Sequence, residues 1–278
     1  MNVRKHSEAE FTEYMLPHNR RQVFFDCIKM RYGVFVLSGL LLFAFLLPFF
    51  AVKIYSEIVY ANVFTIATDA ALLETSAKNI KFYASIAYIP CMAIFSLALA
   101  GVVRVIRQLV WAEGLFFWKD FGAGIKQNGA SYVLTAVIFS SIFALNRFIL
   151  TIDTTGSFVA YIPTGLIVML VIPITLFTLS LTAVYTNKYS VTVKNAALLY
   201  SKNIPASLIF SLMLVSLLLL DLITVGILKY VIMAILAVFL LPLFIEARFL
   251  FDCYVFDKYI NVYSYPDYVD KGMFRMDG

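Results

Sequence analysis

YGVFVLSGLLLFAFLLPFFAV, residues 32–52, has no charged side chain over 21 positions. A second stretch, FYASIAYIPCMAIFSLALAGVV at 82–103, is uncharged over 22. A helix needs about 20 apolar residues to cross the hydrocarbon core of a bilayer, which is about 30 Å thick. Both stretches therefore predict membrane-spanning helices, and they decide the fold class, an all-α polytopic membrane protein.

Further apolar runs bring the predicted number of spans to about six. The third runs from Ser131 to about Ile152, the fourth lies within 154–187, the fifth begins near Ala206 and the sixth near Tyr230. The chain is 62% hydrophobic and 14% charged, with a mean hydropathy of +0.87, whereas soluble domains are about 45–50% apolar and about 25% charged. Lipid is thus the expected solvent. The connection at 54–80 is moderately polar and predicts a short surface helix.

The distribution of basic residues predicts the orientation. The N-terminal tail, the connection between spans 2 and 3, that between spans 4 and 5, and the C-terminal tail hold 6, 4, 3 and 4 of the 22 Lys and Arg residues. Because basic residues favour the cytoplasmic side, both termini are predicted to be cytoplasmic. The net charge of +5 then indicates topology and contact with anionic lipid, not nucleic-acid binding.

Internal similarity predicts a repeated unit. KDFGAGIKQNGASYVLTAVIF from Lys119 aligns with KNAALLYSKNIPASLIFSLML from Lys194 at an offset of 75, and IKMRYGVFVL from Ile28 resembles IKQNGASYVL from Ile125. We expect three helical hairpins joined by cytoplasmic amphipathic elbows that lie in the membrane interface. In the second elbow the glycines should end the interfacial helix. The aligned Asn128 and Asn203 are predicted to cap the helices that follow.

These units form one membrane domain, residues 1–278. The predicted parts are a cytoplasmic tail with an amphipathic segment (1–30), a hairpin (31–103), two elbow-and-hairpin units (104–186 and 187–252) and a cytoplasmic tail (253–278).

The chain contains partial matches to two catalytic motifs, and neither match is complete. DFGAGIKQNGAS, residues 120–131, contains the DFG triplet of kinases and the glycine spacing of a phosphate-binding loop, but Ala130 occupies the position where that loop requires lysine. Both histidines, His6 and His18, precede the first span, and the three cysteines are isolated. We therefore expect no enzymatic activity, no cofactor and no metal site.

Charged residues within the spans are costly and suggest a function by default. Under the 75-residue offset Asp221 aligns with Asn146, next to Arg147, so Arg147 and Asp221 could pair as a structural clamp or line a solute path, and Asp153 is an alternative partner for Arg147. Glu246 and Arg248 are expected at headgroup level near the cytoplasmic end of the sixth span. Pro173 and Pro242 are expected at equivalent depths in two of the units.

The segment from Pro90 to Asn128 resembles the YesL-like family of bacterial integral membrane proteins, whose biochemical activity is not established. The resemblance rests on a proline, a basic segment, a Glu-Gly pair, aromatic residues and a Lys-x-Asn element: Pro90, Arg104, Arg107, Glu113, Gly114, Trp118, Phe121, Lys126 and Asn128. It implies the bacterial cytoplasmic membrane and an association with carbohydrate uptake.

Two functions remain open from the sequence. The first is a non-enzymatic accessory or scaffold of a membrane complex, whose partners would be the lipid bilayer and other membrane proteins or transporter subunits. The second is a transporter or permease subunit that moves a small solute along a polar path near Arg147 and Asp221. The sequence names neither a solute nor an oligomeric state.

Overall fold

The protein is described by a computed structural model at residues 16–66, 69–152, 158–217, 220, 223 and 226–274. All regular structure in this part of the chain is helical. The α-helices are α1 (Arg20–Ile66), α2 (Ala70–Val110), α3 (Phe117–Ile152), α4 (Ile162–Leu166), α5 (Ile172–Val184), α6 (Tyr189–Lys202), α7 (Ile204–Ser216), α8 (Gly226–Ile235), α9 (Leu241–Phe256) and α10 (Val262–Ser264). The 3₁₀ or π segments are η2 (Phe158–Tyr161), η3 (Ile167–Val171), η5 (Leu236–Leu240), η6 (Asp257–Asn261) and η7 (Pro266–Tyr268).

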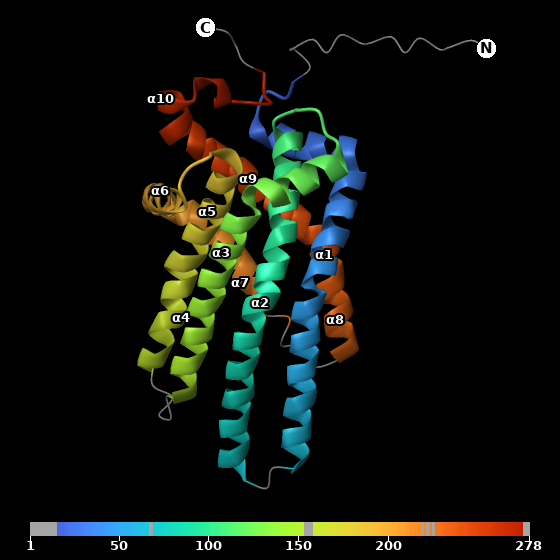
Figure 1. The fold of residues 1–278 in the computed structure, drawn as a ribbon, viewed down its shortest axis with the longest axis vertical. Coiled ribbons are helices and arrows are strands. Elements are labelled where there is room, and N and C mark those ends of the chain that lie inside the picture. Colours follow the sequence, from blue (N-terminus) through green and yellow to red (C-terminus); the bar gives the residue numbers. More distant parts are fainter. Residues whose placement is uncertain are drawn as a thin grey trace, which may run out of the picture.

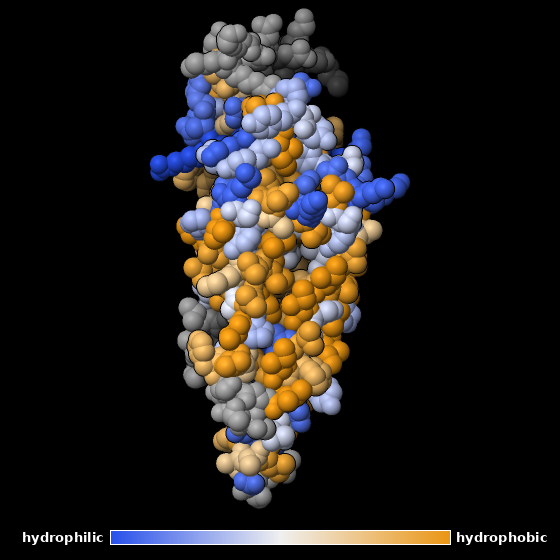
Figure 2. Space-filling view, turned by 90° about the vertical axis from the view of Figure 1, so that its left-hand side faces the viewer, coloured by the Kyte–Doolittle hydropathy of each residue, from blue (hydrophilic) through white to orange (hydrophobic). Residues whose placement is uncertain are grey.

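Five helical stretches of the described chain are long and apolar enough to cross a membrane. They are Arg20–Thr65, Ala70–Val110, Phe117–Ile152, Phe158–Val184 and Gly226–Ser264, and the pair α6 and α7, bent by 106°, counts as a sixth if it is one broken span. The helices form an elongated bundle (Figure 1). Figure 2 shows hydrophilic residues gathered towards the upper end and a broad apolar belt below them. The prediction of an all-α polytopic membrane protein is confirmed.

The start of α1 and the C-terminal tail lie at one end of the bundle, which we call the terminal end. The Phe274 N–H donates to the Pro17 carbonyl there, over 3.0 Å. At the opposite end α1 and α2 extend beyond the other helices (Figure 1). The predicted surface helix at 54–80 is wrong, because α1 continues to Ile66 and α2 begins at Ala70. Moderately polar residues continue a helix when two long helices pack along their length, as α1 and α2 do.

The first and third elbows are separated from their spans by a break, whereas the second is not. Arg31 interrupts α1 with φ −132° and ψ 31°, and Asn203 separates α6 from α7 with φ −136° and ψ 37°. The two positions are aligned in the repeat and share one backbone conformation. The corresponding Asn128 lies inside the continuous helix α3, so the predicted second elbow and the Asn128 cap are wrong.

Asn203 is a cap of a different kind from the one predicted. Its side chain makes no capping bond to α7. Instead its Nδ2 donates to the Leu199 carbonyl over 3.0 Å, which satisfies an end carbonyl of α6. The residue therefore marks the expected boundary but stabilises the helix before it.

The glycines of DFGAG continue α3 because they bring it close to α2. A Cβ on Gly124 would lie 2.6 Å from the Ala100 carbonyl oxygen, and a Cβ on Gly101 would lie 2.5 Å from the Phe121 ring. Small residues allow membrane helices to approach this closely. The Asp120 carboxylate accepts a hydrogen bond from the Phe116 N–H over 2.8 Å and stabilises the start of α3. The stretch is thus a contact between two helices.

Pro173 and Pro242 are placed alike, since a π-helical segment, η3 or η5, ends two residues before each. A proline has no N–H, so the carbonyl four residues earlier loses its usual partner. The carbonyl four residues before Pro173 belongs to Met169 and accepts a hydrogen bond from the Tyr200 hydroxyl of α6. The carbonyl four residues before Pro242 belongs to Val238 and faces Gly39 of α1. A Cβ added at Gly39 would lie 1.8 Å from the Val238 carbonyl oxygen.

Candidate functional site

α9 carries three charged side chains into the interior of the bundle. Glu246, Arg248 and Asp252 have exposed fractions of 0%, 3% and 0%. α9 packs against α1, α2 and α5, so its neighbours cover it on several sides. The expectation that Glu246 and Arg248 lie at headgroup level stays a prediction, because burial among helices does not determine depth in the membrane. Charges buried in this way must be paired, or they cost several kcal/mol each.

Arg248 and Asp252 form a buried ion pair. They are four residues apart and so lie on one face of α9. The Arg248 Nε donates to Asp252 Oδ2 over 3.0 Å, and Nη2 lies 2.8 Å from Oδ1. The Ser180 hydroxyl of α5 donates to Oδ2 over 2.5 Å. The pair joins α5 to α9.

Aromatic rings enclose the guanidinium of this pair. Its central carbon lies 4.4 Å from the Phe177 ring centroid, 5.1 Å from that of Phe210 and 5.2 Å from that of Phe251. These rings belong to α5, α7 and α9. Cation–π contact of this kind is strongest where water is excluded. Arg248 therefore connects three helices as well as neutralising Asp252.

Glu246 differs from Arg248 and Asp252 because it forms no ion pair with another described residue. Neither carboxylate oxygen has a hydrogen-bond partner in the described part of the chain. The Cys27 thiol of α1 lies beside it. Glu246 is thus a fully buried acid that the surrounding protein leaves unsatisfied, the feature that most deserves a functional explanation.

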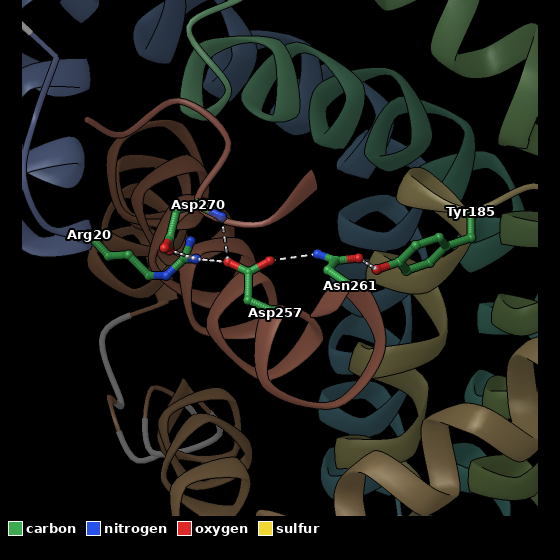
Figure 3. A network of polar contacts seen from close by, with 5 residues as sticks. All are labelled: Arg20, Tyr185, Asp257, Asn261 and Asp270. Carbon is green, nitrogen blue, oxygen red and sulfur yellow. Dashed lines mark hydrogen bonds and ion pairs between the residues drawn. The ribbon is translucent and has the colours of Figure 1, made fainter. Parts of the chain in front are cut away.

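A second polar network lies nearer the terminal end (Figure 3). Asp257 accepts from Arg20 at the start of α1 and from the Asp270 N–H over 3.1 Å, and Arg20 also contacts the Asp270 carboxylate at 3.4 Å. Asn261 donates to Asp257 and accepts from the Tyr185 hydroxyl, each over 2.5 Å. Burial raises the pKa of Tyr185, which keeps this hydroxyl a donor. The network ties α1, α5, η6 and the C-terminal tail together.

The C-terminal tail also closes over the connection between α2 and α3. Lys271 pairs with Glu113 at 2.6 Å, and its amine lies 4.3 Å from the Trp111 ring centroid. Gly272 has φ +85°, and a Cβ there would lie 2.2 Å from the Val110 carbonyl oxygen. Only glycine fits this backbone conformation at such close approach. Glu113, which belongs to the family-like segment, therefore holds the C-terminal tail through its ion pair with Lys271.

The other residues of the family-like segment do not gather into one site. Arg104 donates to Gln127 of α3, and Arg107 donates to the Ala183 carbonyl at the end of α5 over 2.7 Å. Phe121 is buried against α2. The remaining members are Pro90 inside α2, the exposed Gly114, Trp118 and Lys126, and the half-buried Asn128. The segment is a helical hairpin whose polar residues hold α2, α3 and α5 in register.

The proposed partner of Arg147 cannot be placed, because Asp221 lies outside the described residues. Arg147 is half-buried near the end of α3, and its guanidinium lies 5.1 Å from the Phe143 ring centroid. The adjacent Asn146 is buried and bonds Thr164 of α4 over 3.0 Å. The pairing of Arg147 with Asp221 stays a prediction.

Sequence reasoning missed most of the buried polar residues. It did not single out Asp252, Ser180, Tyr185, Asn261 or Arg20 as site residues. One available signal was the four-residue spacing of Arg248 and Asp252, which places opposite charges on one helical face. Another was the similarity of NKYSV at 187–191 to DKYINV at 257–262, the second of which contains Asp257 and Asn261.

Comparison with known proteins adds no further assignment. No family model matches the chain, and no curated protein or solved structure is significantly similar to it. Among the described residues, no group of three or more His, Cys, Asp or Glu side chains could hold a metal ion. The class defined by the structure is a multi-pass helical membrane protein.

Proposed function

We propose that this protein is a non-enzymatic accessory or scaffold subunit of a complex in the bacterial cytoplasmic membrane, with both termini in the cytoplasm. The observation that carries the proposal is the buried Arg248–Asp252 ion pair. Its charges are used within the bundle, where they join α5, α7 and α9. Together with the network around Asp257, they would give partners a rigid body with fixed surfaces. The link to carbohydrate uptake rests on the YesL-like resemblance.

A transporter is the second candidate, and Glu246 is the observation that favours it. An unsatisfied buried acid is the kind of group that takes up and releases a proton or a cation in transport proteins. The π-helical segments before Pro173 and Pro242 favour the same function, since such segments are frequent at functional sites. In this reading Glu246 joins Arg147 and Asp221 as a candidate for the polar path.

Uptake measured with and without other proteins separates the two functions. The first arm measures entry of a panel of labelled sugars into cells that lack the protein and into cells that regain it. The second arm measures entry into liposomes that contain only the purified protein. An accessory subunit predicts a defect in the cells and no transport in the liposomes. Transport by the purified protein alone would refute the accessory role.

Variants of the candidate path sharpen this comparison. Arg147→Gln and Asp221→Asn, singly and together, and Glu246→Gln are each compared with Lys194→Gln, an exposed residue of α6. The accessory proposal expects uptake in complemented cells to survive in all of them, with any loss confined to thermal stability. Loss of uptake at unchanged melting temperature in the path variants, but not in Lys194→Gln, would favour the transporter.

A further inference from the structure

A groove of about 390 Å³ runs along the side of the bundle between the start of α1 and α9. Its walls are apolar and largely aromatic, formed by Phe24, Phe25, Ala247, Leu250, Phe251 and Tyr254. The rings at its edge are accessible, since Phe25 is 56% exposed and Tyr254 is 52% exposed. The groove opens on the outside of the helix pair α1 and α9.

Two arginines of the first turn of α1, Arg20 and Arg21, complete the lining. Arg20 is held by Asp257 and Asp270, so its charge is offset. Arg21 is exposed, lies 6.0 Å from the Phe25 ring centroid, and forms no ion pair with another described residue. The groove is shallow and therefore combines one exposed positive charge with an open apolar surface.

We propose that this groove binds one anionic glycerophospholipid, with its phosphate at Arg21 and one acyl chain between the rings of α1 and α9. The lipid carries a negative charge next to a hydrocarbon chain. The groove places the positive charge of Arg21 next to apolar side chains, so charge can meet charge and chain can meet apolar surface. Because Arg20 and the Asp257 network hold the start of α1 against the bundle, the site exists before the lipid arrives.

The location of the groove agrees with such a ligand. Arg21 belongs to the segment before the break at Arg31, which is the part of α1 predicted to lie in the membrane interface. Negative lipids attract basic residues near the membrane surface, by about 1 kcal/mol for each Lys or Arg. The side chains that follow on α1 and α9 are apolar, as an acyl chain requires.

Native mass spectrometry of the purified protein, titrated with single lipids, tests the site. The probes are dioleoyl phosphatidylglycerol, dioleoyl phosphatidylcholine, which has the same chains without net charge, and glycerol 3-phosphate, which has the phosphate without chains. We expect one phosphatidylglycerol to bind several-fold more tightly than phosphatidylcholine. Arg21→Gln should weaken the phosphatidylglycerol complex about fivefold, and Lys194→Gln, the matched exposed cation on α6, should leave it unchanged.

Ala247→Phe tests the apolar half, because a ring at this position would fill the groove. It should remove the tight binding of phosphatidylglycerol while the protein elutes as a single folded species. If this variant does not fold, the comparison of Arg21→Gln with Lys194→Gln decides. Equal binding of the two lipids, equal losses in the two charge variants, unchanged binding in folded Ala247→Phe, or displacement of the lipid by glycerol 3-phosphate would each overturn the proposal.

Discussion

Replacing Gly39 by alanine should destabilise the protein more than its size suggests. The added Cβ would lie 1.8 Å from the Val238 carbonyl oxygen, with the carbonyl carbon at 2.6 Å. A carbon–oxygen contact normally lies at about 3.3–3.6 Å, so α1 and η5 would have to separate by roughly 1.5 Å. Both groups belong to the backbone, so a rotamer change cannot relieve the clash.

The expected cost is at the upper end of the range for overpacking, about 3 kcal/mol. In a chain of 278 residues, an unfolding entropy of about 2.1 cal/mol/K per residue means that each kcal/mol lowers the melting temperature by about 1.7 °C, so the loss should be about 5 °C. Thermal unfolding in detergent, followed by size-exclusion chromatography with fluorescence detection, measures the shift.

Gly33→Ala is the matched control on the same helix. A Cβ at Gly33 has no atom within 4 Å, and alanine favours a helix over glycine by about 0.5–1 kcal/mol. The control should therefore keep or slightly raise the melting temperature. If Gly39→Ala melts within about 2 °C of the control, α1 and η5 do not approach as closely as described here, and the reasoning fails.

Three further substitutions test other contacts. Arg248→Met should cost about 3–5 kcal/mol by leaving Asp252 buried without its cation, and Asp252→Leu in the same chain should restore most of the loss; a double variant no more stable than the single would contradict the pairing. Gly272→Ala should free the C-terminal tail and speed its cleavage by trypsin at unchanged global melting temperature, and equal cleavage rates would show that the tail is not docked. Asn203→Ala should cost about 0.5–1.5 kcal/mol by removing a helix-end hydrogen bond, whereas Asn128→Ala should cost almost nothing, and equal effects in thermal unfolding would restore the two equivalent caps predicted from the sequence.

The spans could be predicted because their requirement is compositional. A stretch such as 32–52 needs only to be long and uncharged, and its place in the chain follows directly. The internal repeat also indicated where two helices break, since the aligned positions Arg31 and Asn203 adopt nearly the same backbone angles. What the alignment could not predict is that the middle unit lacks the break.

The difference at Asn128 arises from packing between distant residues. Gly124 and Gly129 are poor helix formers, so sequence reasoning ended a helix there. In the structure Gly124 contacts Ala100 of α2 and Gly129 contacts Leu97. These contacts favour the helical conformation by tertiary packing, a contribution that no local pattern contains.

The buried site was hidden for a related reason. Glu246 and Arg248 follow a long apolar run, which is typical of charges that reach the membrane surface. Their burial depends on which helices cover α9, and the Ser180 that completes the site is 72 residues from Asp252. A single sequence without contact information does not specify such pairings.

The π-helical segment η5 fixes the angular phase of everything that follows it. A π-helical turn contains one residue more than an α-helical turn, and each residue advances an α-helix by about 100°. If the same sequence formed an ordinary α-helix through η5, Arg248 and Asp252 would be rotated by about 100° and would no longer point into the bundle. Deleting a single residue within Leu236–Leu240 would convert this wide turn into an ordinary α-helical turn and leave the ion pair of α9 on the same side of the helix, whereas a deletion between Leu241 and Arg248 would turn the pair by about 100°.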